Sequence, residues 1–115
     1  MGHRHRAELS AGPDRIAAMG HSSGAHLAAL ASVRKAAFGK RREASTVVGA
    51  VVGISGVYDL TITDGGPDIY RRFLSGASEE LPERYRRASP RQVATGDAPP
   101  TLLVHGSDDE TVPVA

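Results

Sequence analysis

The sequence contains no cysteine, and no apolar run in it approaches the roughly 20 residues of a membrane-spanning helix. The absence of cysteine excludes disulfides, thiolate nucleophiles and cysteine-based zinc sites, and it fits a reducing compartment. The N-terminus lacks the apolar core of a signal peptide, so we expect a cytoplasmic chain with no membrane span. A strong charge imbalance is also missing, because the formal net charge is only +1, and we therefore expect no nucleic-acid partner.

What is present suffices for one small domain. The 115 residues are 40% hydrophobic and 23% charged, which is ordinary for a globular chain with a modest core. Residues 1–13 are polar, basic and without periodicity, so we predict a loose N-terminal tail there. His3 and His5 in this tail are interpreted as solvated side chains and not as metal ligands. The folded segment is predicted to span residues 14–115.

The central feature is a G-x-S-x-G pattern over Gly20–Gly24, with Ser22 in the middle. It lies between a predicted strand, Arg15–Met19, and a predicted helix, Ala25–Lys35, which contains no glycine or proline. A sharp strand-to-helix turn favours glycine on either side, and it exposes the serine hydroxyl at the end of the strand. The backbone N–H of Ser23 then points to where an oxyanion would form. The alternative interpretation is a serine that only caps the helix.

Two more strands are predicted downstream. Thr46–Ile54 is a continuous apolar, β-branched run, which is typical of a parallel strand buried on both faces. Thr101–His105 is the third predicted strand, and an acidic loop over residues 106–113 follows it. No internal repeat is visible. The predicted order of strand, helix, strand, helices and strand indicates an α/β fold.

The connections between the second and third strands are less regular. Gly39 is suited to cap the end of the first helix, and Gly65–Pro67 is a clear break. Ile69–Leu74 is predicted to be a short helix. Residues 79–87 are predicted to be an irregular helical stretch interrupted by Pro82, and residues 90–100 a polar connection.

Three segments, residues 20–28, 54–60 and 99–113, resemble in this order the α/β-hydrolase fold. They are most similar to its serine esterase and lipase branch, which includes carboxylesterase-like, feruloyl-esterase-like and kynurenine-formamidase-like enzymes. The resemblance makes the three predicted strands similar to the fifth, sixth and seventh of that fold. It implies an incomplete α/β-hydrolase fold, a C-terminal-half segment without the early strands and without the last strand and its histidine loop.

The resemblance also assigns the site residues. Ser22 matches the nucleophile, the Ser23 N–H one oxyanion donor, and Asp109 the acid of the family's His-Gly-x-x-Asp-x-x-Val-Pro pattern, which skips Asp108. Asp59 is the rival for the acid, because some members of the fold place it after the sixth strand. A structural interpretation of Asp109 is a turn or capping residue of the loop.

The triad base is the part that the resemblance does not supply. In this fold the histidine follows the acid, and no histidine follows Asp109 in the sequence. His21 occupies the variable elbow position and is expected to point away from the nucleophile. His26 is expected to face neighbours or solvent one turn into the helix. His105 is expected to order the acid loop by hydrogen bonding, with a catalytic role as its alternative.

A glycine-rich loop that would give the second oxyanion donor is not found before Ser22. The resemblance therefore implies a serine hydrolase that acts on small-molecule esters, needs no cofactor, and is inactive as this chain alone. A peptidase of the prolyl-oligopeptidase type is the alternative within the class. A non-catalytic remnant or binding module is the alternative outside it.

A packing argument points to the same incomplete domain. Right-handed crossovers that step in one direction place all connecting helices on one face of a parallel sheet. The opposite face would then stay uncovered, although the run Val47–Ile54 is apolar on both faces. The first strand would also keep an unpaired edge. We therefore expect self-association through the uncovered face as a possible interaction of this chain.

Overall fold

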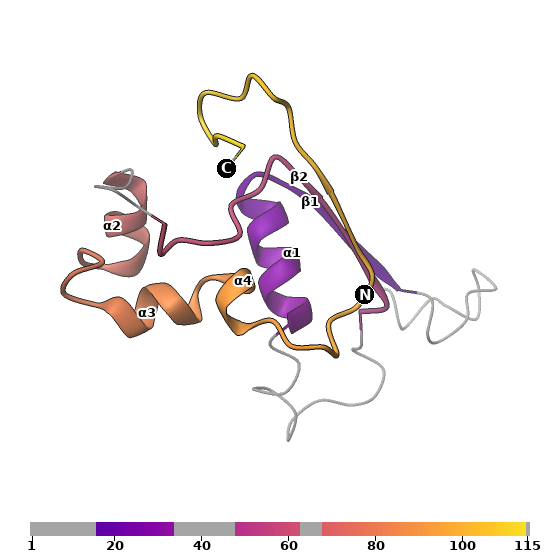
Figure 1. Ribbon diagram of the computed structural model, residues 1–115, viewed down its shortest axis with the longest axis horizontal. Helices are drawn as coiled ribbons and strands as arrows, with labels where there is room; N and C mark the ends of the chain where they lie inside the picture. The colour runs from indigo at the N-terminus through magenta and orange to yellow at the C-terminus, as the bar shows by residue number, and fades with distance from the viewer. Residues whose placement is uncertain (1–15, 34–47, 63–67, 115) are drawn as a thin grey trace.

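The structure is a computed structural model that describes residues 16–33, 48–62 and 68–114 (Figure 1). The predicted tail over residues 1–13, the capping role of Gly39 and the break at residues 65–67 lie outside the described residues. Within the described ranges the order of elements is strand, helix, strand, three helices and strand. This is the order that the sequence predicts.

The three strands form one parallel sheet in the order β1-β2-β3, where β1 spans Ala17–His21, β2 spans Ala50–Ile54 and β3 spans Thr101–Val104. In the register, Gly20 is the partner of Gly53, which is in turn the partner of Leu103. β1 ends two residues later than predicted, because the backbone pairing with β2 continues through His21. The predicted α/β class with three neighbouring parallel strands is confirmed.

The helices all lie on one side of this sheet (Figure 1). Helix α1, Ser23–Val33, returns the chain from β1 to β2 and contacts both strands. Its buried alanines, Ala25 and Ala29, face the sheet, and Val51 of β2 is almost fully buried beneath the helix layer. Small alanine side chains allow close approach of helix and sheet, which gives the elbow at the start of α1 a firm base.

The opposite side of the sheet has no cover among the described residues. Side chains alternate between the two faces of a strand, so Met19, Val52 and Leu102, which are partners in the register, share this side. Met19 is 72% exposed and Leu102 58% exposed, while Val104 at the end of β3 is 47% exposed. The predicted placement of helices on one face is therefore confirmed, and an apolar sheet face remains open.

A second, smaller core forms away from the sheet. Helix α2, Asp68–Leu74, and helix α3, Pro82–Arg87, pack together around four buried residues. These are Leu60, Leu74, Tyr85 and Ala88. The prediction that Pro82 interrupts a helix is wrong, because Pro82 starts α3 at a position where a missing backbone N–H costs nothing. The polar connection predicted after it contains a short helix, α4, Pro90–Val93, which also begins with proline.

Three long-range hydrogen bonds hold this second core together and join it to α1 and to the loop after β2. His26 Nε2 donates to the carbonyl oxygen of Ala88 at 2.6 Å, and the Leu60 N–H donates to Ser89 Oγ at 2.8 Å. The Arg91 N–H donates to the carbonyl oxygen of Tyr58 at 3.0 Å. The expectation that His26 faces neighbours or solvent is thus resolved, because His26 is buried and ties α1 to the end of α3.

Candidate active site

Ser22 lies at the turn between β1 and α1 with a backbone φ of 56°. This left-handed conformation is uncommon for residues other than glycine, and it is typical of strained functional positions. The backbone holds Ser22 from both sides, because its N–H donates to the carbonyl oxygen of Ile54 at 2.9 Å and its own carbonyl oxygen accepts from the His26 N–H at 3.1 Å. The geometry is that of a nucleophile elbow. A helix N-cap residue has an extended backbone instead, so the capping alternative fits Ser22 poorly.

The two elbow glycines have different surroundings. A Cβ atom at Gly20 would overlap the carbonyl group of Gly24 and lie 2.6 Å from the backbone nitrogen of Ala25, so the start of α1 packs directly on β1 only because Gly20 has no side chain. A Cβ atom at Gly24 would meet nothing within 4 Å among the described residues. The sequence-based expectation that both glycines are needed for space is therefore supported at Gly20 and not at Gly24.

Ser23 is the first residue of α1. The N–H groups of the first helical turn have no partner within the helix, and the helix dipole favours negative charge at this end. The Ser23 N–H is therefore suited to bind an oxyanion beside Ser22, as the sequence predicts. This assignment stays a prediction.

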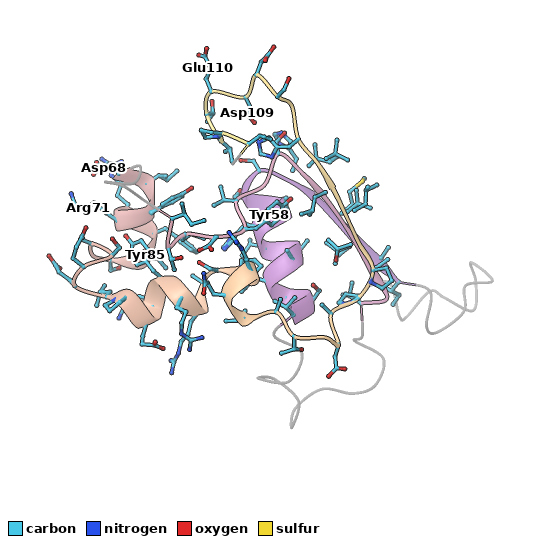
Figure 2. All side chains as sticks on the ribbon, in the orientation of Figure 1. Tyr58, Asp68, Arg71, Tyr85, Asp109 and Glu110 are labelled. Atoms are coloured by element: carbon cyan, nitrogen blue, oxygen red, sulfur yellow. The ribbon has the colours of Figure 1, made fainter. Side chains whose placement is uncertain are left out.

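Asp109 lies on the loop that follows β3, at the carboxyl edge of the sheet where β1 also ends (Figure 2). Its Oδ1 accepts from the Val112 N–H at 2.9 Å and from the Thr111 N–H at 3.0 Å. Its Oδ2 lies 3.3 Å from His105 Nε2. These backbone N–H donors, with the charges of His105 and His21, hold the pKa of the Asp109 carboxyl below its ordinary value. Asp109 is therefore ionised at neutral pH, as a triad acid must be.

His105 closes the acid loop. Its Nε2 donates to the carbonyl oxygen of Val112 at 2.5 Å, and its ring is largely buried. The expected role of His105 in ordering the loop is confirmed by this bond. The nitrogen that faces Asp109 is the same atom, so His105 supports the position of the acid from within the loop.

Asp59, the rival acid, is fully engaged elsewhere. Its Oδ1 accepts from the Thr61 N–H at 2.9 Å and from the Thr61 hydroxyl, and its Oδ2 accepts from Gln92 Nε2 at 2.9 Å. Burial alone raises the pKa of the Asp59 carboxyl, but these hydrogen bonds and the nearby Arg91 outweigh burial and lower it. Asp59 thus joins the loop after β2 to α4, and the role of Asp109 as the acid stays a prediction.

The remaining elbow histidine, His21, is the last residue of β1, and it is exposed. Since His21, Ile54 and Val104 are partners in the register, its side chain lies on the uncovered side of the sheet. The expectation that His21 points away from the nucleophile stays a prediction. The described residues include no group of three or more histidine, aspartate or glutamate side chains arranged to hold a metal ion.

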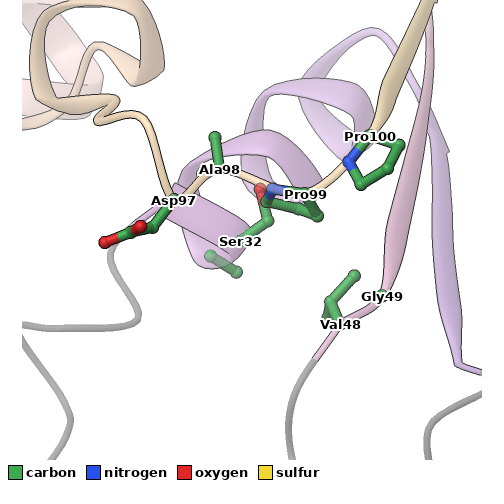
Figure 3. Close-up of a pocket in the computed structure, with 8 residues that line it drawn as sticks. Ser32, Val48, Gly49, Asp97, Ala98, Pro99 and Pro100 are labelled. Atoms are coloured by element: carbon green, nitrogen blue, oxygen red, sulfur yellow. The ribbon is translucent and has the colours of Figure 1, made fainter.

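One cavity adjoins the acid loop, and another lies at the opposite end of the strands. The larger, of about 840 Å³, lies under the acid loop and is lined among others by Tyr58, Tyr70, His105 and Val112. The smaller, of about 290 Å³, lies at the opposite end of the strands between Ser32, Gly49 and Pro100 (Figure 3). The smaller cavity is remote from Ser22 and Asp109, because it adjoins the end of α1 and the start of β2 and β3.

Ser55 lies at the same carboxyl edge of the sheet as Ser22, but the sequence-based assignment gives it no role. Ser55, which follows β2, has a φ of 49° and donates its N–H to the carbonyl oxygen of Val104 at 2.8 Å. Ser22 and Ser55 therefore leave two neighbouring strands by the same left-handed turn. The sequence signal for this turn is the Ser55-Gly56 pair, which follows a predicted buried strand.

Comparison with known proteins agrees with this architecture. A structure of a truncated form of carbohydrate esterase from gut microbiota superimposes with a TM-score of 0.79 at 25% identity, over 97% of this chain and 47% of that chain. The parallel strands, the strained serine turn and the acid loop define a partial α/β-hydrolase fold.

The profile of the BD-FAE family matches residues 3–115, and the chain belongs to that family. It is 38% identical over 117 residues to esterase LipC and 34% identical over 117 residues to esterase LipQ, both from Mycobacterium tuberculosis. These matches cover 90% and 95% of this chain. The chain spans only 28% of the length of either relative. Across the described residues, no helix combines the length and the apolar character that crossing a bilayer requires.

Proposed function

We propose that this chain is the segment of a carboxylic-ester hydrolase that carries the nucleophile and the acid. The observation that supports it most directly is the left-handed turn at Ser22, at the same sheet edge as an ionised Asp109 whose loop is fixed by hydrogen bonds. The names of the relatives, esterase LipC and esterase LipQ, favour ester substrates over peptides. Residues 14–115 form this segment in the proposal, and small-molecule esters are its substrates.

The chemistry is acyl transfer. Ser22 Oγ bonds to the ester carbonyl carbon while a histidine accepts the hydroxyl proton, and the oxyanion lies at the Ser23 N–H. The bond to the alcohol oxygen then breaks, and the alcohol leaves with that proton. Water next attacks the acyl-serine, releases the acid and restores the Ser22 hydroxyl. Asp109 orients and stabilises the charged histidine.

Neither His26 nor His105 serves as the base in this proposal, since His26 Nε2 binds the Ala88 carbonyl oxygen and His105 Nε2 binds the Val112 carbonyl oxygen. Without a base, serine is a poor nucleophile near neutral pH. Loss of one oxyanion donor costs a further factor of about 100 to 1,000 in rate. We therefore expect negligible ester hydrolysis by this chain alone.

Chemical rescue tests the proposal in the chain as it exists. The purified protein is treated with a fluorophosphonate probe, with and without added imidazole as an external base, and the adduct is located by peptide mass spectrometry. We expect slow labelling at Ser22 that imidazole accelerates. Ser22→Ala removes the adduct, while Ser23→Ala keeps it, because the oxyanion donor at residue 23 is a backbone N–H. Absence of an adduct at Ser22 under both conditions would overturn the proposal.

A second candidate function rests on the uncovered sheet face. Met19, Val52 and Leu102 form an apolar surface across the three strands. We propose that a second copy of this chain covers it, which makes self-association the function that remains if Ser22 is inert. Uncharged apolar faces of this kind are typical of protein interfaces.

A further inference from the structure

The ring of Tyr58 ends in a notch on β2 that two glycines create. A Cβ atom at Gly53 would overlap the Tyr58 hydroxyl oxygen, and a Cβ atom at Gly56 would lie 2.5 Å from it and 2.7 Å from Tyr58 Cζ. Neither glycine has a positive φ, so no backbone requirement explains them. The space that they leave is filled by Tyr58.

This notch adjoins the elbow. Gly53 is the register partner of Gly20, on which the start of α1 packs. A Cβ atom at Gly56 would lie 2.7 Å from the Cβ atom of Ala25, which is fully buried in the first turns of α1. The tip of Tyr58 is therefore enclosed where β2 and the start of α1 meet.

Tyr58 also borders a cavity that extends to the acid loop. Tyr58 lines the cavity of about 840 Å³ together with His105 and Val112, the two residues joined by the bond that closes the loop (Figure 2 labels Tyr58 and Asp109). The backbone of Tyr58 is fixed as well, since its carbonyl oxygen accepts from the Arg91 N–H. One side chain thus lies between the elements that carry Ser22 and Asp109.

The hydroxyl group itself is an exception to the usual pairing of buried polar atoms. The oxygen is buried and has no hydrogen-bond partner among the described residues. Burial raises the pKa of the Tyr58 hydroxyl, although the nearby Gly56 N–H lowers it, so the group is a neutral phenol at physiological pH. The Tyr58 hydroxyl therefore contributes by filling the notch between the two glycines.

We infer that Tyr58 is a positioning residue for the nucleophile elbow, whose ring tip holds the start of α1, and with it Ser22 and the Ser23 N–H, at a fixed place against β2. The inference rests on the proposed function only in treating Ser22 as the nucleophile and the Ser23 N–H as the oxyanion donor. The placement itself is open to measurement without any catalysis.

A mutant cycle tests the packing. Gly53→Ala is expected to lower Tm by about 10 °C, because the added methyl group meets the hydroxyl. Tyr58→Phe alone is expected to change Tm little, since it removes an unpaired group. In the double variant the methyl group occupies the space of the lost hydroxyl, with its next contacts at 3.2 Å to Cζ of residue 58 and 3.3 Å to Leu103 Cδ2. The double variant should recover at least half of the loss.

The matched control for this cycle is Gly56→Ala. Its methyl group would still meet Ala25 at 2.7 Å, so Tyr58→Phe should not rescue it. Equal rescue of both glycine variants, or no rescue of Gly53→Ala, would overturn the assigned packing.

Amide hydrogen exchange tests the positioning. In Tyr58→Leu we expect the N–H groups of Ser22 and His26, which hold the elbow, to exchange about tenfold faster, while that of Ala88 in the second core changes little. Tyr70→Leu is the matched control, because Tyr70 packs on the second core and should leave the elbow amides unchanged. If Tyr58→Leu does not fold, Gly53→Ala should show the same local effect and the double variant should reverse it.

Uniform acceleration at all amides, or no change at Ser22 and His26, would reject the positioning role. This readout does not depend on the reactivity of Ser22. If exchange behaves as expected and no phosphonate adduct forms at Ser22, the proposed function fails while the positioning of the turn by Tyr58 stands.

Discussion

The backbone N–H of Ser22 donates to the carbonyl oxygen of Ile54 at 2.9 Å, so the last hydrogen bond between β1 and β2 is made by the candidate nucleophile itself. The left-handed turn of Ser22 is thus held by the middle strand on one side and by the first turn of α1 on the other. Strain at a single residue persists when its surroundings determine it in this way. The left-handed turn at Ser22 therefore depends on β1, α1 and β2 together, and substitutions in these elements test this dependence.

Gly20→Ala should damage this unit. The new methyl group would overlap backbone atoms of Gly24, and backbone cannot move aside as a flexible side chain can. We expect a loss of about 3 kcal/mol in the free energy of unfolding, at the upper end for overpacking. Urea unfolding followed by circular dichroism measures it.

Gly24→Ala is the matched control for that substitution. A methyl group at Gly24 meets nothing within 4 Å among the described residues, and alanine is a better helix former than glycine. The free energy of unfolding should stay the same or rise by about 0.5 kcal/mol. Equal losses in both variants would show that the close contact of β1 and α1 is not as described.

Ser89→Ala should destabilise the second core. Ser89 is fully buried, and its hydroxyl donates to the Tyr85 carbonyl oxygen at 2.7 Å while accepting from the Leu60 N–H. Its loss leaves the buried N–H without a partner, which costs about 1–3 kcal/mol in the free energy of unfolding. Ser107→Ala, at an exposed serine, should change it by less than about 0.5 kcal/mol. A Ser89→Ala variant as stable as the Ser107→Ala variant would contradict the role of Ser89.

Acid should release the loop that carries Asp109. The pKa of Asp109 is lower in the folded state than its ordinary value of 3.8, so its ionised form stabilises the fold above that pH. The contribution is lost as the pH falls from 3.8 through the lower folded-state pKa. We expect the Val112 amide, which donates to Asp109, to lose its protection from exchange in this window.

Asp109→Asn serves as the control for the acid transition, because an amide oxygen still accepts hydrogen bonds but does not titrate. Its Val112 amide should show a shallower pH dependence below 3.8. Asp59 titrates in the same range and stays present in both proteins, so the difference between them isolates Asp109. Parallel pH curves would mean that the carboxylate of Asp109 does not hold the loop.

The uncovered sheet face should drive self-association of this chain. Sedimentation velocity at increasing concentration should show species larger than the monomer, and Leu102→Lys should return the protein to monomer by placing a charge on this apolar face. Ile69→Lys is the matched control, because Ile69 is 65% exposed on α2, away from this face. A wild-type protein that stays monomeric throughout would rule the interface out.

The pattern of residues predicted most of the sheet, while the site residues stay a prediction. The apolar run that ends at Ile54 and the G-x-S-x-G spacing around Ser22 are local signals, so strand, turn and helix could be placed within a few residues. The sequence predicts that Pro82 interrupts a helix and that residues 90–92 continue a polar connection, but each proline begins a short helix, because proline is compatible with a helix start as well as with a break. Only the surrounding fold shows which of the two occurs.

The sequence by itself determined the order of strands and helices around two candidate site patterns, a serine in a G-x-S-x-G spacing and an aspartate in a loop after the third strand. The tertiary structure decided which of the two candidate acids is available, because Thr61 and Gln92 occupy Asp59 while backbone N–H groups hold Asp109. It also decided that His26 is buried and binds the Ala88 carbonyl oxygen, and that the Tyr58 side chain packs against Gly53 and Gly56 beside the elbow. These roles depend on contacts between residues far apart in the chain, and the spacing of residue types does not encode such contacts.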